Sequence, residues 1–364
     1  MKIQDVIDLM VDLAPLHLAA DWDNVGLMVG DPSRQLTGIA VALDPTYEAV
    51  EQAIATGANM LVTHHPLLFK PAKSLDLRQE PGKTIQALIK HDVALYAAHT
   101  NLDATAVNVA LAEKIGLSGT RILDRMGTYP DYKLTVFAPE DAAARVQEAA
   151  WDAGAGRTER YERTSYRSPV SGTFRPLPGA EPAEGDVCEQ ETTDEVRLEF
   201  LVRTPHLAAV RQAIRAAHPY EEPAMDAVVI EGSGTPYGYG LVGDLETPRS
   251  LQDLARHVKG ALDLPAVRMV GPAERSVQRV AWLGGSGGDY FKKARAAGAD
   301  VYITGEVRHH AMLDALALGL TFIEVGHVGS EQPVVPFLAE FFKERIGEAV
   351  PIQALHQVDP FTVI

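Results

Sequence analysis

The stretch that decides the fold of this chain is LVTHHPLLFK, residues 61–70. Its apolar start, continuous with Met60, is typical of a buried parallel strand, and Pro66 ends that strand. His64 and His65 are therefore expected at the carboxyl end of the strand, where open α/β sheets bind their ligands. Adjacent strand residues point to opposite sides, so the pair is better placed to ligate two metal ions than to chelate one. Taken alone, it fits a metal site and a packed or surface pair equally well.

Length and composition bound the class of protein. A chain of 364 residues is longer than one hydrophobic core usually supports, so two or three domains are expected. The formal charge of −16 disfavours binding to nucleic acid or to an anionic membrane. With Cys188 as the single cysteine, a metal site must rely on His and carboxylate ligands. The first 20 residues do not resemble a signal peptide and no segment has a membrane-spanning pattern, so a cytoplasmic location is expected.

Strands and helices alternate on both sides of the histidine pair. This alternation predicts an α/β fold, with a parallel sheet that carries helices on both faces. The expected strands are residues 39–43, 60–63 and 93–98, and the expected helices are residues 2–15, 46–55, 84–90 and 105–115.

The C-terminal third repeats this pattern. The segment ATGANMLVT at residues 55–63 is matched by AAGADVYIT at 296–304, and in both the last threonine follows the turn glycine by six positions. The lead-in GLMVGD at 26–31 is likewise similar to GLVGD at 240–244. Matched spacing favours duplication over chance similarity of two βαβ units. We therefore predict two pseudo-symmetric α/β halves that form one domain.

The repeat also aligns two polar motifs. One strand ends in His99-x-x-x-Asp103, and its counterpart ends in His327-x-x-x-Glu331. A carboxylate in this position alone is typical of a helix N-cap, which suits Asp103. If the two halves pack face to face, their strand ends can meet in one cleft. Two such motifs near a histidine pair then predict a metal site.

Residues 127–234 interrupt the repeat with a different order of predicted strands and helices. The pattern predicts the ferredoxin-like order βαββαβ. The loop 175–193, rich in Pro, Gly and Glu, is expected to be mobile. We therefore predict an inserted domain of residues 127–234 within a metal-binding domain made of residues 1–126 and 235–364. The expected elements of the insert are residues 133–138, 140–153, 160–174, 196–204, 205–217 and 224–230.

Five motifs together carry a family resemblance that covers the whole chain. They are WDNVGL (22–27), THHPLLFK (63–70), HTNLD (99–103), TGE (304–306) and GHVGSE (326–331). The chain resembles the Nif-three-like dinuclear metal-centre proteins, also known as type 2 GTP cyclohydrolase homologues. HPYEEP at 218–223 is similar to the end of the insert that longer bacterial members carry, which is like PII or CutA folds.

The resemblance implies two divalent metal ions per subunit, with a carboxylate able to bridge them. It also implies a homo-hexamer shaped as a hollow ring. The ligands that it implies are His64, His65, Asp103, His327 and Glu331.

Other residues are candidates for supporting roles. His99 is not among the family's usual ligands, so we expect it to orient them. Glu306 stands where the family motif carries Asp, which leaves its role open. His310, with its neighbour His309, is a candidate to line the cleft, although a surface or packing role is the commoner one. Lys70 is a candidate contact for an anionic substrate. The commoner alternative is that it is an ordinary solvated surface lysine. The glycine-rich run 284–288 is a weak match to a phosphate-binding turn.

Ligands of nitrogen and oxygen suit Zn, Fe or Mn. Such a pair of ions predicts a metal-dependent hydrolase, for which a nucleotide is one candidate substrate. The sequence assigns no nucleophile, general acid or general base. Two alternatives stay open. The chain can be a metal-binding or metal-delivery protein whose insert senses a small molecule or a partner, or the metals can merely brace the two halves.

Overall fold

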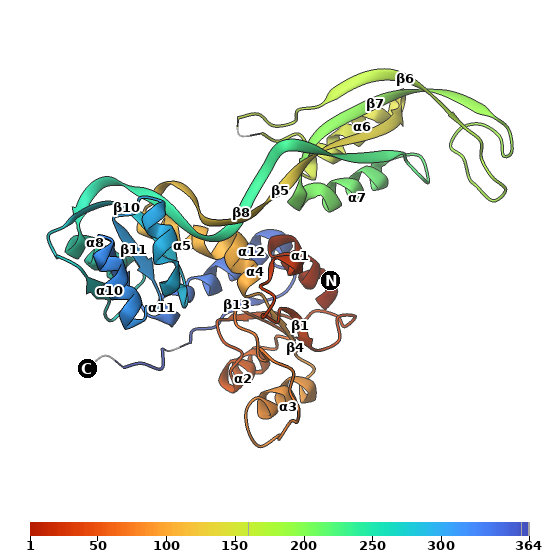
Figure 1. The fold of residues 1–364 in the computed structure, drawn as a ribbon. Helices are drawn as coiled ribbons and strands as arrows, with labels where there is room; N and C mark the ends of the chain where they lie inside the picture. Colours follow the sequence, from red (N-terminus) through yellow and green to blue (C-terminus); the bar gives the residue numbers. More distant parts are fainter. Residues whose placement is uncertain (159, 358, 363–364) are drawn as a thin grey trace. The chain divides into compact units, whose positions relative to one another are not determined.

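The chain folds into two units that the long strands β5 (Ser118–Pro139) and β8 (Met225–Ser250) connect (Figure 1). The structure is a computed structural model that describes residues 1–158, 160–357 and 359–362. Unit 1 comprises residues 1–126 and 237–364, and unit 2 comprises residues 127–236.

The first sheet of unit 1 contains the strand of the histidine pair, β3. Its order is β1-β4-β3-β2-β13, with β1 antiparallel to β4 and the other neighbours parallel. Every residue of β2, β3 and β4 is buried, as expected for a parallel sheet that is covered on both faces. The strands are β1 (Gly26–Val29), β2 (Ile39–Ala42), β3 (Met60–Thr63), β4 (Ala94–Ala97) and β13 (Ile352–Ala354).

The second sheet of unit 1 has the same parallel centre. Strands β10, β11 and β12 are parallel, and β8 and β9 flank them in antiparallel orientation. The matched segments 55–63 and 296–304 end in β3 and β11, each the middle strand of its parallel triplet. The lead-ins differ, because β1 pairs with β4 whereas residues 241–244 of β8 pair with β10. The strands are β9 (Arg268–Val270), β10 (Ser276–Leu283), β11 (Val301–Thr304) and β12 (Thr321–Glu324).

One apolar core lies between these two sheets. It joins alternate residues of β2–β4 and β10–β12 to the apolar faces of α1, α5, α8 and α12. Separate clusters pack α2 and α3 on the outer face of the first sheet, and α9 and α10 on that of the second. The bounds are α1 (Ile3–Leu13), α2 (Tyr47–Ala55), α3 (Gly82–Lys90), α5 (Asn108–Ile115), α8 (Leu251–Ala261), α9 (Phe291–Ala296), α10 (His309–Ala317) and α12 (Val334–Ile346).

Short helical segments complete the chain. They are η1 (Leu16–Leu18), α4 (Thr100–Leu102), the π-helical turn η2 (Asp103–Val107), η3 (Thr204–His206), η4 (Gly287–Tyr290) and α11 (His327–Glu331). In the part of the chain that the structure describes, each helix is too short or too polar to span a lipid bilayer.

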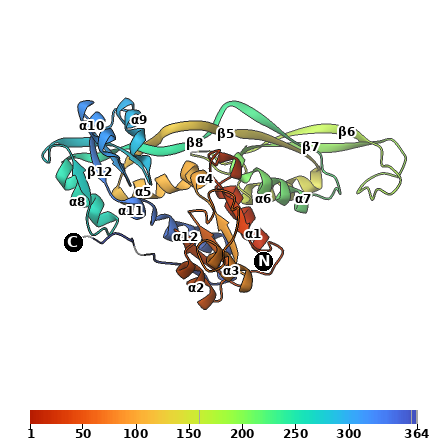
Figure 2. The same ribbon diagram turned by 60° about the horizontal axis from the view of Figure 1, so that its bottom comes forward.

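Unit 2 has the element order β5-α6-β6-β7-α7-β8. Its strands, in the order β6-β7-β5-β8, belong to the same eight-stranded sheet as β10, β11, β12 and β9 of unit 1. Figure 2 shows β5 and β8 running side by side. Both are far longer than the predicted strands 133–138 and 224–230. Much of each strand is exposed or half-buried, so it lacks the apolar pattern that marks a buried strand. The other elements are α6 (Glu140–Asp152), β6 (Tyr166–Phe174), β7 (Glu191–Arg203) and α7 (Leu207–Ala217).

Gly30→Ala is expected to destabilise unit 1 more than Gly57→Ala. Both glycines have positive φ (115° and 77°), which costs an alanine about 1–2 kcal/mol. A Cβ at Gly30 would also lie 2.6 Å from the Cα of Ala94 at the start of β4, whereas one at Gly57 meets nothing within 4 Å. In urea unfolding we expect Gly30→Ala to cost about 2 kcal/mol more. Equal losses would contradict the close approach of β1 to β4.

Candidate metal centre

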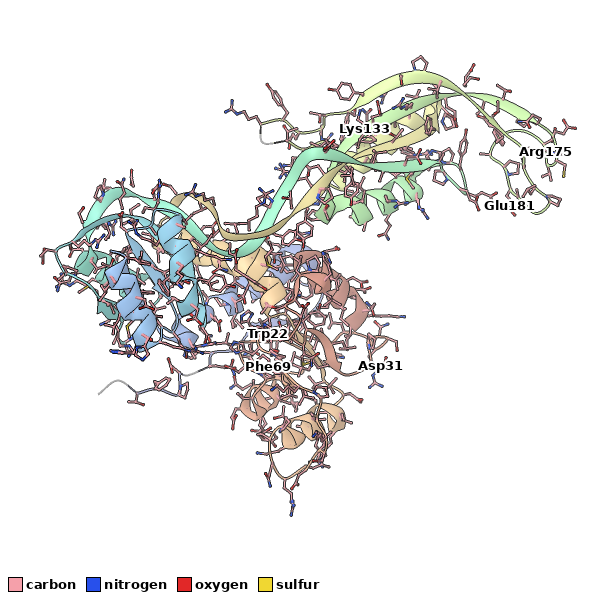
Figure 3. The ribbon with its side chains drawn as sticks, in the orientation of Figure 1. Trp22, Asp31, Phe69, Lys133, Arg175 and Glu181 are labelled. Atoms are coloured by element: carbon pink, nitrogen blue, oxygen red, sulfur yellow. The ribbon has the colours of Figure 1, made fainter. Side chains whose placement is uncertain are left out.

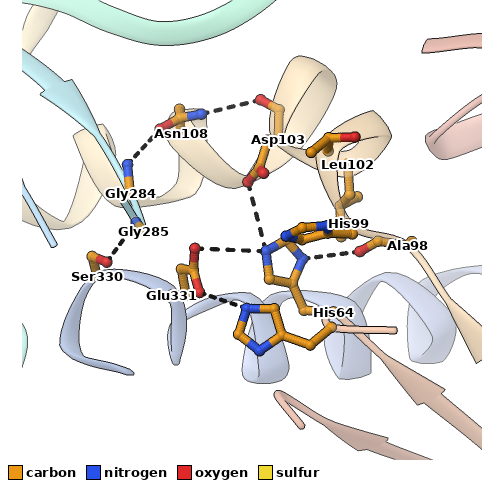
Figure 4. Close-up of polar contacts among 12 residues, drawn as sticks. His64, Ala98, His99, Leu102, Asp103, Asn108, Gly284, Gly285, Ser330 and Glu331 are labelled. Atoms are coloured by element: carbon orange, nitrogen blue, oxygen red, sulfur yellow. Dashed lines mark hydrogen bonds and ion pairs between the residues drawn. The ribbon is translucent and has the colours of Figure 1, made fainter. Parts of the chain in front are cut away.

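The candidate ligands come from the ends of elements in both segments of unit 1, which we call its two halves, residues 1–126 and 237–364. His64 and His65 follow β3, and Asp103 begins the π-helical turn after β4, a geometry that is frequent at functional sites. His327 and Glu331 lie on one face of α11, four residues apart. Figure 4 shows the contacts that bring these elements together.

His64 is a fully buried neutral imidazole with an unpaired nitrogen. Its Nδ1 lies 2.9 Å from the carbonyl oxygen of Ala98, so Nδ1 carries the proton and donates it. Burial lowers the pKa of His64 to about 3. Nε2 therefore carries a lone pair, and it has no hydrogen-bond partner among the described residues. It lies 3.7 Å from Oδ1 of Asp103 and 3.9 Å from Oε1 of Glu331, both too far for a hydrogen bond.

Glu331 is buried between two other imidazoles. Its Oε2 lies 3.0 Å from Nε2 of His65 and 3.1 Å from Nε2 of His327. Burial favours the neutral acid, but the hydrogen bonds from His327 and His65 outweigh it and hold the pKa of Glu331 well below its usual range. Glu331 is therefore an anion in this site.

The two imidazoles beside Glu331 have raised pKa values. Burial lowers the pKa of His65, but its hydrogen bonds with Asp44 and Glu331 prevail and raise it to about 10. The hydrogen bond with Glu331 raises the pKa of His327 to about 9, against the effect of burial. Both rings are therefore positively charged imidazolium groups at neutral pH in the metal-free protein. A metal ion that binds at Nε2 of either ring has to displace the proton there.

Two carboxylates support these imidazoles from the far side. Nδ1 of His65 donates to Oδ1 of Asp44 over 2.7 Å. Oε2 of Glu306 lies 3.5 Å from Nδ1 of His327 and accepts a hydrogen bond from Ser286 Oγ. Sequence reasoning missed Asp44, although its place just after β2, at the carboxyl edge of the same sheet, was a usable signal.

His99 is held by Asp23. Nδ1 of His99 donates to Oδ1 of Asp23 over 2.9 Å, and the backbone N–H of Thr100 donates to Oδ2. Burial raises the pKa of Asp23, but the hydrogen bonds from His99 and Thr100 dominate and hold it well below its usual range. One nitrogen of His99 lies within 4.8 Å of nitrogens of His64 and His65. His99 thus lies beside the ligand candidates, and Asp23, quoted in a motif without a role, fixes its ring.

Asp103 also lies beside the imidazoles, but its carboxylate is farther from them than that of Glu331, at 3.7 Å from Nε2 of His64. Burial, and then the charge of Glu331, raise the pKa of Asp103 well above its usual value. Its backbone carbonyl accepts a hydrogen bond from Nδ2 of Asn108, whose Oδ1 accepts one from the N–H of Gly284. Asn108 therefore links the π-helical turn to the glycine-rich run of the other half (Figure 4).

The glycine-rich run 284–288 packs against Glu331. Gly285 has φ +61°, and a Cβ there would collide with Oε1 of Glu331. The N–H of Gly285 donates to Ser330 Oγ over 2.8 Å. At Gly285 the missing side chain therefore makes room for the carboxylate, and its N–H is bound within the protein, unlike the free N–H groups of a phosphate-binding turn.

Other predicted site residues lie elsewhere. Lys70 is exposed in the loop after β3, and His309 and His310 are exposed at the start of α10. None of the three is among the residues that line the cavity of about 550 Å³ over the site. That cavity includes His65, His99, Asp103, His327 and Glu331 in its lining.

Comparison with known proteins identifies the family. Residues 1–360 match the sequence model of Duf34/NIF3 (NGG1p interacting factor 3). The chain belongs to the DUF34/NIF3 family. It is 36% identical to a protein of Halalkalibacterium halodurans named "GTP cyclohydrolase 1 type 2 homolog", over 100% of both chains. It is 38% identical to the Bacillus subtilis protein of the same name, over 89% of this chain and 87% of that one.

A solved structure supports the fold of this DUF34/NIF3 protein. The Bacillus cereus protein related to NIF3 is 36% identical, matches with a TM-score of 0.82, and covers 100% of this chain and 99% of that one. A Staphylococcus aureus protein of known structure matches with a TM-score of 0.68 at 33% identity, over 100% and 99% of the two chains. The family resemblance and the mixed α/β fold with two sheets are thereby confirmed.

The residues of this DUF34/NIF3 protein fit a metal ion by two measures. The donor atoms are imidazole nitrogens and carboxylate oxygens, which bind Zn, Fe and Mn. Bonds of about 2.0–2.2 Å place neighbouring ligand atoms of one ion about 3–4 Å apart, which is the range of the contacts of His64 Nε2. Donor atoms of His65, His327 and Glu331 also lie within 4.8 Å of one another.

Gly285→Ala is expected to displace the Glu331 carboxylate. Mutations that disturb the groups holding a metal ligand in place typically weaken metal binding about tenfold or more, and we expect a loss of this size for divalent ions. Gly298→Ala is the matched control, because Gly298 also has positive φ but its Cβ would meet nothing closer than 3.7 Å. Zinc titration of the two variants, with urea unfolding as a check on folding, measures the difference. Equal zinc affinities would contradict the role of Gly285.

His64→Asn is expected to flatten the pH dependence of stability in the metal-free protein. The folded chain keeps His64 neutral down to about pH 3, whereas the unfolded chain protonates it below about pH 6.5. Unfolding therefore takes up a proton in this window. As the pH is lowered through it, the free energy of unfolding decreases by up to about 1.4 kcal/mol per pH unit. Urea unfolding between about pH 4 and 7 compares the slopes, and parallel curves would contradict a buried neutral His64.

Proposed function

We propose that this chain binds two divalent ions and is a metal-dependent hydrolase. The observation that carries the proposal concerns Nε2 of His64. This nitrogen is fully buried, has no hydrogen-bond partner among the described residues, and faces one oxygen each of Asp103 and Glu331. A buried lone pair without a hydrogen bond is unfavourable, and neither Asp103 nor Glu331 brings a proton to Nε2 of His64 at hydrogen-bonding distance. A cation between them turns the same arrangement into a favourable one.

The number of ions is inferred from the arrangement about Glu331. Its Oε1 faces His64, near Asp103, while its Oε2 faces His65 and His327. The donors thus divide into two sets that share one carboxylate. Glu331 would thus be placed to hold both ions, in the role of the bridging carboxylate that the family resemblance implies.

The rest of the site would position these ligands. Asp44 and Glu306 orient the rings of His65 and His327, and Ala98 fixes the tautomer of His64. Zn, Fe or Mn bound here would supply Lewis-acid activation of a water molecule and of the scissile bond. The cavity of about 550 Å³ has the size of a small-molecule site. The relatives' name supports a nucleotide as one candidate substrate.

A second function, regulation by a ligand of unit 2, is favoured by a cavity in that unit. Its volume is about 650 Å³, and Glu181, Glu195 and Tyr220 are among the residues that line it. The element and strand orders of unit 2 support the proposal of an inserted ferredoxin-like domain. In this alternative unit 1 binds or delivers metal without turnover.

Three further predictions accompany the proposal. The parallel triplets β2–β4 and β10–β12 support two pseudo-symmetric halves. A cytoplasmic location and a homo-hexamer stay predictions from the sequence and the family resemblance. Native mass spectrometry of the purified chain measures the number of subunits.

Metal analysis of site variants tests the proposed function. The wild-type chain, chelated and then reloaded with Zn, Fe or Mn, is expected to hold two ions per subunit and to hydrolyse at least one compound in a panel of nucleotides and phosphate esters. Glu331→Gln is expected to lose both ions, because Glu331 faces both donor sets. His65→Ala is expected to lose mainly the ion of the set with His327.

His310→Ala is the control, since this exposed histidine lies outside the cavity lining. Full metal content in Glu331→Gln would refute the site. Two bound ions with no turnover across the panel would instead favour the metal-delivery alternative. If chelation lowers the melting temperature but alters neither turnover nor delivery to an acceptor, the ions merely brace the two halves.

A further inference from the structure

Two large aromatic side chains lie exposed at the candidate metal centre. Trp22 is 63% exposed and Phe69 is 46% exposed. Their rings stack with centroids 6.5 Å apart and an interplanar angle of 28°. Figure 3 labels the two side chains next to each other in unit 1. Exposed apolar surface of this kind, when it is contiguous, marks a binding site more often than chance exposure.

This aromatic pair belongs to the cavity of the metal centre. Trp22 and Phe69 line the same cavity of about 550 Å³ as the candidate ligands. Both rings contact His99 edge-on, with centroids 5.8 and 5.7 Å away. The aromatic surface therefore begins one side chain away from the histidine pair.

The loops that carry the pair are rigidly fixed. Asp23, next to Trp22, has a side chain with 0% exposure that hydrogen-bonds to His99 and Thr100. Nδ2 of Asn24 donates to the carbonyl oxygen of Leu68, the residue before Phe69. These bonds tie the two loops together, so the rings are held in place before a ligand arrives, which lowers the entropy cost of binding.

Two tyrosines line another part of the cavity. Tyr239 and Tyr290 contact each other edge-on with centroids 6.4 Å apart, and both line the cavity. Among the described residues that line it there is no lysine or arginine, whereas Asp44, Asp103 and Glu331 contribute acid groups. The protonated rings of His65 and His327 are already paired with Asp44 and Glu331, so the described lining offers no unpaired cation to a phosphate, and attraction for an anion has to come from bound metal ions.

We propose that Trp22 and Phe69 form a stacking platform for a planar heteroaromatic ring, and that the substrate joins this ring to an anionic group which reaches the metal centre. A nucleoside phosphate has this chemistry. The inference rests on the proposed function for the anionic end only, because stacking of the ring needs no metal. Stacking on an aromatic face tolerates every base, because every base has a π-face, so this platform selects the class of substrate and not one purine or pyrimidine.

The test compares ligands that differ only in the ring. Binding of adenosine, guanosine and cytidine 5′-monophosphates and of ribose 5-phosphate to the zinc-loaded protein is measured by isothermal titration calorimetry. The wild-type protein is expected to bind each nucleotide about tenfold or more tightly than ribose 5-phosphate, with little difference among the bases. Equal binding of ribose 5-phosphate would overturn the platform.

Matched variants assign the preference to the platform. Trp22→Leu and Phe69→Leu are expected to reduce the ring preference at least severalfold with unchanged zinc content, whereas Trp22→Phe keeps most of it. Tyr161→Leu, which removes a 72% exposed aromatic ring from unit 2, is the control and keeps it fully. A full preference in zinc-loaded Trp22→Leu overturns the proposal. Should Trp22→Leu fail to fold or to hold zinc, Phe69→Leu decides in the same way.

The design separates this inference from the proposed function. If the wild-type protein holds none of Zn, Fe or Mn, the proposed function fails, and adenosine is compared with ribose in the metal-free protein and its variants. Equal binding then overturns the platform as well. If Trp22→Leu changes the oligomeric state in analytical ultracentrifugation but leaves the ring preference intact, the aromatic pair covers a subunit contact and the platform is overturned.

Discussion

The buried carboxylate of Glu331 is the group on which the rest of the site depends. A buried charge is costly unless it is paired, and here the rings of His65 and His327 pair it. Its second oxygen faces His64, whose ring is fixed by a backbone carbonyl. Gly285 has no side chain where the carboxylate lies. Because Glu331 comes from one half of unit 1 and the histidine pair from the other, the shared apolar core has to hold both halves in register.

The cavity combines two environments. Its deep part is polar and acidic, and its imidazoles are oriented by Asp44, Asp23 and Glu306. Its exposed part carries the rings of Trp22 and Phe69. The two parts meet at His99, which contacts both rings and lies beside the ligand candidates. A small molecule with one flat apolar end and one anionic end matches this division.

Most of the candidate ligands that the structure brings together follow simple local rules of sequence. The pair after β3 was recognisable from the apolar run and Pro66. His327 and Glu331 were recognisable from the His-x-x-x-carboxylate motif at a strand end, which the repeat aligns with His99 and Asp103. The supporting carboxylates Asp44 and Glu306 could not be assigned partners, since these contacts join residues more than twenty positions apart. Strands β5 and β8 were underestimated because their exposed lengths lack an apolar pattern.

The sequence by itself determined the mixed α/β class, the family and the residue types available to bind a metal, because strand period, turn residues and motif spacing are local properties of the chain. Only the tertiary structure decided that Oε1 and Oε2 of Glu331 face different imidazoles, that Gly285 makes room for this carboxylate, and that Trp22 stacks on Phe69. These are distances between segments far apart in the chain, and they are set by how two sheets pack on one core.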